Sequence, residues 1–181
     1  MPKTKIIKRR QFLTKFGLYG LGGVAALALT STKGYAVLGF GKKDNQKSDK
    51  TFSYTLTDQE WQNKLTSEQY RVLRKDGTER AGSSALNNVK EAGIFHCAGC
   101  EHPLFDSATK FESGTGWPSF YQPLNDAAVG TSTDHHLFYA RTEIHCANCG
   151  GHLGHVFEDG PKPTGLRYCM NGVAMTFKPA S

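Results

Sequence analysis

The chain has 181 residues, enough for one domain with an extension, since a segment of about 150 residues can bury roughly 70% of its unfolded surface. Its formal net charge of +6 would suit a nucleic-acid partner if it were spread over the chain. However, residues 1–36 carry seven basic residues and no acidic one, and the remainder has fifteen basic against sixteen acidic residues. Because nucleic-acid binders usually carry a basic stripe, we expect no nucleic-acid partner.

Residues 1–36 have the three-part layout of a secretory signal peptide. A basic start is followed by an apolar run over about residues 16–30, and then by small residues that suit cleavage after Ala36. The run is shorter than the roughly 20 residues that span a bilayer. Arg9 and Arg10, followed by Gln-Phe-Leu, resemble the twin-arginine export signal. We therefore expect export to the periplasm without stable membrane insertion; a membrane anchor facing the periplasm is the alternative.

Two short helices are predicted after a linker. Residues 37–53 are polar, rich in Gly and Lys and aperiodic, which is typical of a linker. The helices are indicated by two capping boxes, in which a Thr is followed three residues later by an acid or amide. The second helix should end near residue 76, with Gly77 supplying the left-handed exit. The capping boxes are Thr57 with Glu60 and Thr66 with Gln69.

Beyond residue 90 the chain changes to short apolar or alternating runs broken by Gly, Pro and Asn. Runs of this length, spaced by turn residues, are typical of strands in an antiparallel, mainly β domain. The runs are GIFHC at 93–97, HLFYARTEIHC at 136–146, GHVF at 154–157, LRYCMN at 166–171 and VAMTF at 173–177.

Four of the five cysteines form two C-x-x-C pairs. Two such knuckles can close a tetrahedral site with four thiolates and no open position, which suits one structural zinc ion. Two disulfides, a dithiol redox motif and an iron–sulfur centre are the alternatives. The predicted metal ligands are Cys97, Cys100, Cys146 and Cys149.

Cys169 is left over. An odd cysteine in an exported protein is buried and inert, paired with another chain, or reactive. Arg167 and Asn171, two residues to either side, would share its face in a strand, and a nearby Arg favours a thiolate. His152 and His155 could manage the protons that a nucleophilic thiol requires, although an H-x-x-H pair is also typical of a metal site.

Several segments together resemble the B-type methionine sulfoxide reductases, which reduce methionine-(R)-sulfoxide. They are SGTGWPSFY, GGHLGHVFEDGPKPTGLRYCMN, the two C-x-x-C knuckles and the lead-in LTDQEWQNKLTSEQYRVLRKDGTER. The resemblance covers roughly residues 54–178, which we take as the domain. It implies a mainly β fold of two antiparallel sheets, called a β-tent, with short N-terminal helices and a zinc site away from catalysis.

The resemblance also implies roles for single residues. Cys169 would attack the sulfoxide sulfur and become a sulfenic acid as methionine leaves. Trp117, in a tight loop between Gly116 and Pro118, would hold the S-methyl group of the substrate. His155, His152 and Asn171 complete the predicted catalytic residues, with the two histidines protonating the sulfoxide oxygen. Further substrate-binding residues would be Arg167 and Asp159.

One position departs from the family pattern. Many members carry a resolving cysteine where this chain has Thr115, which cannot form a disulfide. The sulfenic acid of Cys169 should therefore be reduced directly by an external thiol, either a thioredoxin-like protein or a low-molecular-weight thiol. The expected partners are this reductant and oxidised methionine in proteins or peptides, and we expect a monomer.

Two other functions fit part of the sequence. One is a zinc-ribbon binding module in which Cys169 is a packing residue, and the near-neutral charge beyond residue 36 disfavours its nucleic-acid form. The other is a thiol-disulfide oxidoreductase that uses one C-x-x-C motif, which would normally occur beside a βαβ pattern that the sequence does not show.

Overall fold

The computed structural model describes residues 51–135 and 140–181. The predicted signal peptide and most of the predicted linker lie outside the described residues. Within the described ranges, no helix is long and apolar enough to cross a membrane. The elements of this part of the chain are α1 (Asp58–Lys64), α2 (Ser67–Lys75), η1 (Ala85–Asn88), β1 (Gly93–Cys97), β2 (Pro103–Asp106), η2 (Ser107–Thr109), β3 (Lys110–Phe111), β4 (Ser119–Phe120), β5 (Val129–Asp134), β6 (Arg141–Cys146), β7 (His152–Phe157), β8 (Arg167–Met170), η3 (Gly172–Ala174) and β9 (Met175–Pro179).

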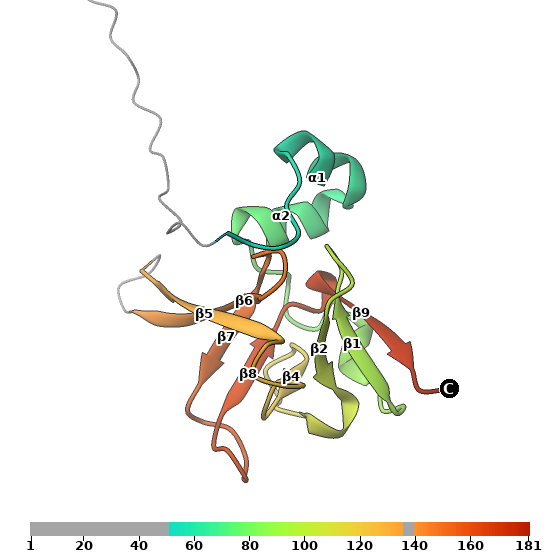
Figure 1. The fold of residues 1–181 in the computed structure, drawn as a ribbon. Helices are drawn as coiled ribbons and strands as arrows, with labels where there is room; N and C mark the ends of the chain where they lie inside the picture. Colours follow the sequence, from blue (N-terminus) through green and yellow to red (C-terminus); the bar gives the residue numbers. More distant parts are fainter. Residues whose placement is uncertain (1–50, 136–139) are drawn as a thin grey trace, which may run out of the picture. The chain divides into compact units, whose positions relative to one another are not determined.

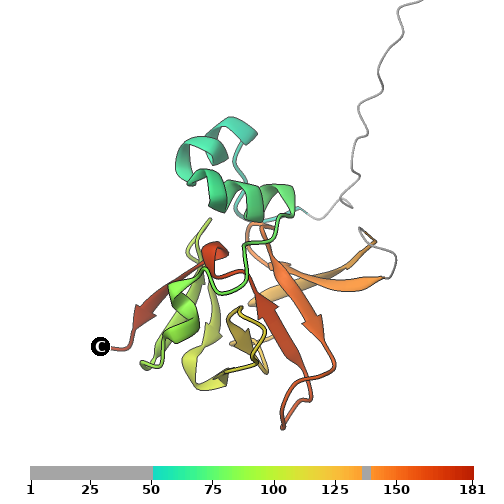
Figure 2. The same cartoon turned by 180° about the vertical axis from the view of Figure 1, so that it is seen from behind.

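The strands form two antiparallel sheets, and α1 and α2 lie together at one end of them (Figures 1 and 2). The smaller sheet has the order β2-β1-β9, and the larger has the order β3-β4-β8-β7-β6-β5. The predicted mainly β fold with two antiparallel sheets and short N-terminal helices is therefore confirmed.

Both capping boxes form as predicted. In the second, the Thr66 hydroxyl accepts a hydrogen bond from the Gln69 N–H at 3.2 Å, and the Gln69 side chain accepts one from the Thr66 N–H at 3.0 Å. The predicted exit from α2 is wrong by one residue, because the left-handed residue is Asp76, with φ 53°. Asp tolerates this conformation. Gly77 is required instead by close approach, since a Cβ there would lie 2.8 Å from the Arg71 carbonyl oxygen.

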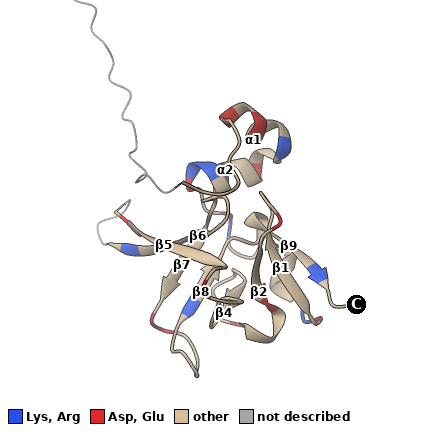
Figure 3. Cartoon of the chain, viewed as in Figure 1, with Lys and Arg blue, Asp and Glu red and all other residues tan. Residues whose placement is uncertain are grey.

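The second helix is amphipathic and covers one of the cysteine knuckles. Val72 and Leu73 are fully buried, and Arg74 Nη1 donates a hydrogen bond to the Cys149 carbonyl at 3.1 Å. Figure 3 shows both acidic and basic residues on the two helices. Among them, Lys75 of α2 pairs with Asp58 of α1 at 3.4 Å across exposed surface. Apolar burial therefore holds α2 in place, because exposed ion pairs contribute little.

The predicted strand runs correspond only in part to the observed strands. The runs at 93–97, 154–157 and 166–171 fall on β1, β7 and β8. The run at 173–177 is divided, because Gly172–Ala174 is a 3-10 turn and β9 begins at Met175. The run at 136–146 yields β6 from Arg141, while residues 136–139 lie outside the description. The strands β2, β3, β4 and β5 were not predicted, because their residues are few or largely polar.

An aromatic cluster fills the space between the two sheets. The rings of Phe105 and Phe120 are stacked with centroids 4.4 Å apart, and Phe95 meets Phe120 edge-on at 4.9 Å. Tyr168 of β8 joins this cluster through Phe105 at 5.9 Å. Since strand side chains alternate between faces, the packing of the partly buried Tyr168 against this cluster turns its neighbour Cys169 to the opposite face of the large sheet.

Ordered packing begins inside the segment predicted as a linker. The ring of Phe52 meets His145 edge-on, with centroids 5.8 Å apart. Phe52 also lies over Gly150, where a Cβ would come within 2.2 Å of the ring. Gly150 has a φ of 67°, so both its conformation and this close contact favour glycine.

Candidate active site and metal centre

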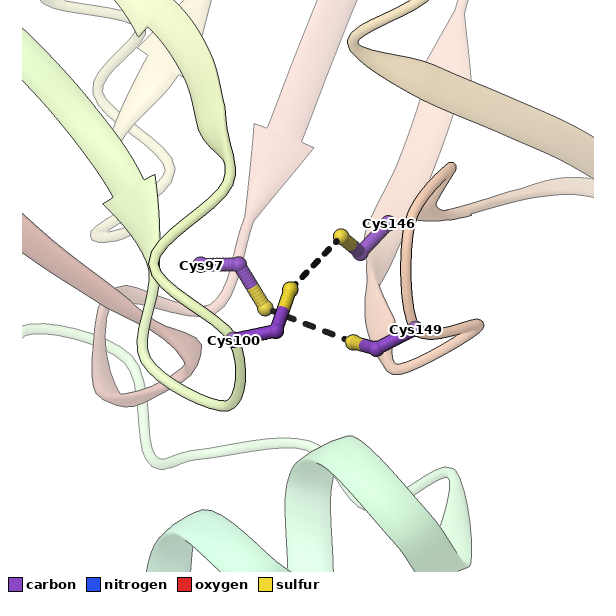
Figure 4. A group of neighbouring side chains, drawn as sticks. All are labelled: Cys97, Cys100, Cys146 and Cys149. Atoms are coloured by element: carbon purple, nitrogen blue, oxygen red, sulfur yellow. Dashed lines mark hydrogen bonds between the residues drawn. The ribbon is translucent and has the colours of Figure 1, made fainter. Parts of the chain in front are cut away.

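The four paired cysteines come together with the spacing that a tetrahedral metal ion requires. The Sγ atoms of Cys97 and Cys149 lie 3.7 Å apart, and those of Cys100 and Cys146 lie 3.6 Å apart (Figure 4). All four thiols are free, so they form no disulfide. Zinc–sulfur bonds of about 2.3 Å in a tetrahedron separate the sulfurs by about 3.8 Å. The arrangement therefore fits one metal ion bound by four thiolates.

Equivalent backbone turns build the two knuckles. The Glu101 N–H donates to the Cys97 carbonyl at 2.8 Å, and the Gly150 N–H donates to the Cys146 carbonyl at 2.9 Å. The first knuckle follows β1 of the small sheet, and the second follows β6 of the large sheet. A metal ion held by both would tie the two sheets together.

Cys169 lies in a row of directly paired residues that crosses the large sheet. Direct partners in an antiparallel sheet point to the same face. Residues of β4, β8, β7, β6 and β5 are paired in turn, so one face of the sheet gathers a thiol, an imidazole, a carboxylate and two hydroxyls. The row is Ser119, Cys169, His155, Glu143 and Ser132.

A β-bulge brings the two predicted histidines to this same face. His152 and His155 are three residues apart, a spacing that places side chains on opposite faces of a regular strand. The pairing of β6 with β7 shifts between Ile144 and His145, and this shift inserts one extra residue into β7. The two imidazole rings consequently meet edge-on, with centroids 5.4 Å apart.

Each of these histidines is hydrogen-bonded to a carboxylate. His152 Nδ1 lies 2.8 Å from Glu143 Oε1, and His155 Nε2 lies 2.8 Å from Asp134 Oδ2. An ionised carboxylate only accepts hydrogen bonds, so these ring nitrogens carry protons. The other nitrogen of each ring then remains for chemistry. Among the residues that the structure describes, the buried His152 Nε2 has no hydrogen-bond partner.

Burial controls the acidity of His155. It lowers the pKa of this imidazole, and the positive charge of Arg141 acts in the same direction. The hydrogen bond with Asp134 raises the pKa, but the net shift is downward. A protonated His155 would therefore be a stronger acid than an ordinary imidazolium.

The hydroxyl of Thr115 lies beside the thiol. Thr115 Oγ1 is 3.9 Å from Cys169 Sγ and 2.8 Å from Ser113 Oγ. Ser113 Oγ is in turn 2.8 Å from Ser119 Oγ, the hydroxyl of the residue paired with Cys169. Thr115, where the family resemblance implies a resolving cysteine in many members, thus faces Cys169 with a chain of hydroxyls.

The predicted substrate-binding residues Arg167 and Asp159 pair with each other. Arg167 Nε and Nη2 each donate to an Asp159 oxygen at 2.9 Å, and the guanidinium lies 4.5 Å from the centre of the Phe157 ring. The pKa of Arg167 is raised chiefly by Asp159, and Cys169 acts in the same direction. Arg167 therefore lies close enough to Cys169 to interact with it electrostatically.

Trp117 and Asn171 are both held by Glu79. Trp117 Nε1 donates to the Glu79 carbonyl at 3.2 Å, and Asn171 Oδ1 accepts from the Glu79 N–H at 2.9 Å. Asn171 is buried, and its Nδ2 donates to the Leu153 carbonyl at 3.0 Å. Backbone groups thus occupy both ends of the Asn171 amide and hold it in place. Its catalytic role stays a prediction.

Three acidic residues at the site were not predicted from the sequence. Glu143 could have been noticed as a charge within the alternating run RTEIHC, because a charged residue on a buried strand needs a partner. Glu79 carries no such signal, since the groups that it contacts lie at least 38 residues away in the sequence. Asp134 pairs with Arg141, seven residues further on, but its contact with His155 spans 21 residues and has no signal in the sequence.

The chain matches known proteins over most of the part that the structure describes. Residues 65–179 match the family described as the SelR domain. A peptide methionine sulfoxide reductase MsrB of Agrobacterium fabrum is 54% identical over 68% of this chain and 91% of its own length. The MsrB of Pseudomonas putida is 53% identical over 74% of this chain and 96% of its own length.

A longer plant relative matches over a smaller share of its own length. The chloroplastic peptide methionine sulfoxide reductase B1 of Oryza sativa is 51% identical over 70% of this chain, which spans 59% of that protein. The bacterial relatives match almost end to end, and the family match covers more than half of the chain. The chain therefore belongs to the SelR domain family, together with these peptide methionine sulfoxide reductases.

Proposed function

We propose that the enzyme reduces methionine-(R)-sulfoxide through a sulfenic acid on Cys169, which an external thiol then reduces. Membership of the SelR family supports the reaction and makes the protein an oxidoreductase. The observation that carries the mechanism is the row that pairs Cys169 with His155, with Thr115 in the place of a second thiol.

The proposed cycle has two stages. The Cys169 sulfur attacks the sulfoxide sulfur, the oxygen is protonated and passes to Cys169, and methionine leaves while the cysteine becomes a sulfenic acid. A first external thiol then forms a mixed disulfide with Cys169 and releases water. A second thiol frees Cys169 and leaves as the oxidised disulfide of the reductant. The reductant would be a thioredoxin-like protein or a low-molecular-weight thiol.

The neighbouring side chains support particular roles in the first stage. The sulfoxide oxygen leaves only when it is protonated, and His155 and His152 each keep one ring nitrogen free of their carboxylate partners. Trp117 would form the wall against the S-methyl group. Arg167, fixed by Asp159, would stabilise negative charge near Cys169. A monomeric enzyme stays part of the proposal.

We also propose that the four-cysteine site holds structural zinc. The sulfur separations of 3.6 and 3.7 Å support a tetrahedral ion. Four protein ligands leave no open coordination position, so zinc would stabilise the fold and take no part in the reaction. The ligands would be Cys97, Cys100, Cys146 and Cys149.

Export to the periplasm is proposed from the sequence alone. The twin-arginine-like signal with Arg9 and Arg10 supports it, and a membrane anchor facing the periplasm remains the alternative. The twin-arginine route would carry the domain already folded, so zinc could be bound in the reducing cytoplasm.

Loss of zinc should destabilise the domain. We expect one zinc ion per purified chain, and none after Cys100→Ser. Structural zinc contributes on the order of 10 kcal/mol in small zinc peptides. Even a part of this should lower Tm by about 10 °C or more. Metal analysis and calorimetry measure both effects, and Cys169→Ser is the matched control that keeps zinc. A purified protein without zinc, with mapped disulfides among the four cysteines, would contradict the proposal.

Cys169 should be required for activity. With dithiothreitol as reductant, the wild type should reduce N-blocked methionine-(R)-sulfoxide and leave the S epimer unchanged. Cys169→Ser should lower the rate by about 10³-fold or more, because loss of a nucleophile removes the covalent route. Cys100→Ser, assayed below its Tm, is the comparison for thiol loss elsewhere. An inactive wild type would defeat the proposed function, and an active Cys169→Ser would defeat the assignment of the nucleophile.

The oxidised enzyme should hold a sulfenic acid and no internal disulfide. After one equivalent of substrate without reductant, mass spectrometry should find a sulfenic-acid adduct on Cys169. Thr115→Cys should instead form an internal disulfide, since Oγ1 of this residue already lies 3.9 Å from Cys169 Sγ. Thr115→Ser, the matched control, should keep the adduct. An internal disulfide in the wild type would exclude the cycle with one redox-active cysteine.

The export proposal predicts the mature N-terminus. The protein from the periplasmic fraction should begin at residue 37, because a signal peptidase would cut after Ala36. Replacement of both Arg9 and Arg10 by Lys should keep the precursor in the cytoplasm, and Lys8→Arg serves as the charge-matched control. A cytoplasmic wild-type protein that starts at Met1 would contradict the proposal.

A further inference from the structure

Glu79 is a buried acid between α2 and β1 that the proposed reaction does not yet use. Its side chain is among the few buried charged groups of the described chain, with an exposure of 5%. Its Oε1 accepts a hydrogen bond from the Gly172 N–H at 2.6 Å, and its Oε2 accepts one from the Val173 N–H at 2.9 Å. Two backbone donors thus compensate the carboxylate for its loss of water.

The backbone of Glu79 contacts two further parts of the site. Its N–H donates to Asn171 Oδ1 at 2.9 Å, and its carbonyl accepts from Trp117 Nε1 at 3.2 Å. One residue therefore makes four hydrogen bonds to the Trp117 loop and to the turn that follows the Cys169 strand. These two segments lie 38 and 92 or more residues away in the sequence.

The surrounding segment packs closely against both loops. A Cβ at Gly172 would lie 2.0 Å from Ser84 Oγ, so the turn after β8 has no room for a side chain there. On the other loop, the Gly116 carbonyl accepts hydrogen bonds from the Gly82 N–H at 2.7 Å and from Asn87 Nδ2 at 3.1 Å. The position of Trp117 relative to Cys169 therefore depends on the segment that Glu79 begins.

We propose that Glu79 is a positioning residue that sets the placement of Trp117 against the substrate's S-methyl group and so determines selectivity for a methyl sulfoxide. The inference rests on the proposed function, in which Trp117 forms this wall. The carboxylate fixes the Glu79 backbone through Gly172 and Val173, and that backbone fixes the indole and Asn171.

The substitution Glu79→Gln removes the positioning role of the carboxylate with the least change in side-chain shape. A carboxylate accepts hydrogen bonds at both oxygens, whereas an amide presents its NH₂ group to one of the two N–H donors. That donor would be left unpaired, and the Glu79 backbone would shift. A displacement of about 1 Å in a positioned group can cost about 10²-fold in rate. We expect kcat/KM for N-blocked methionine-(R)-sulfoxide to fall by about 10-fold or more.

Selectivity separates positioning from a purely structural role. A pocket that fits one group discriminates against an extra methylene by about 10–200-fold. The experiment compares kcat/KM for N-blocked methionine-(R)-sulfoxide with that for its S-ethyl analogue. Glu79→Gln should lower the methyl-to-ethyl ratio by at least about 5-fold. A loss of folded protein alone would lower both rates equally and leave the ratio unchanged.

Glu68→Gln is the matched control. Glu68 lines the same hollow of about 390 Å³ as Glu79, but it is exposed and pairs with Arg71. The control makes the same change of charge nearby and should keep the ratio. Trp117→Phe removes the indole N–H that binds Glu79, and its effect on the ratio should not add to that of Glu79→Gln.

The outcomes distinguish this inference from the proposed function. An inactive wild type overturns the proposed function and the inference with it. An active wild type whose ratio changes by less than about 2-fold in Glu79→Gln overturns the inference alone, whatever the change in Tm; additive effects in the double variant also overturn it. If Glu79→Gln does not fold, Glu79→Asp, which keeps the charge but shortens the side chain, decides by the same ratio.

Discussion

The antiparallel register of β4, β8, β7 and β6 decides which side chains face Cys169. A slip of β8 by one residue would turn Cys169 toward the core and bring Tyr168 or Met170 to the open face. The aromatic cluster opposes such a slip, because Tyr168 and Phe120 are directly paired and both lie on the core side. The burial of aromatic surface between the sheets therefore also places the thiol on the face opposite the core.

The bulge in β7 brings a second histidine to this face of the sheet, which a regular strand could not do. It places His152 on the face of His155, and carboxylates of β6 and β5 hold the two rings. In His155, desolvation outweighs the hydrogen bond that the ring donates to Asp134, so the pKa moves down. The carboxylate fixes the ring and the burial makes its protonated form more acidic. Both effects suit the transfer of a proton to a weakly basic sulfoxide oxygen.

Local chemistry made part of this structure predictable from the sequence. The capping boxes and the C-x-x-C knuckles depend on residues a few positions apart, and the spacing alone identifies them. His152 and His155 share a face only because of a bulge in β7. Their spacing of three residues alone would predict opposite faces of the strand. Glu79 depends on donors more than 90 residues away. No periodicity in the sequence marks such a residue, because only the fold brings its partners near.

The five thiols differ in their surroundings, and this difference limits which of them can be oxidised and reduced in the proposed cycle. Four thiols lie in contact with one another at the spacing of metal ligands, whereas Cys169 lies beside the hydroxyl of Thr115. If zinc is bound before export, those four are protected when the protein meets an oxidising compartment. Cys169 alone would then be oxidised in each turnover, and Thr115 could not reduce it. The cytoplasmic thioredoxin pool would be out of reach, so the cycle would require a thiol donor within the periplasm itself.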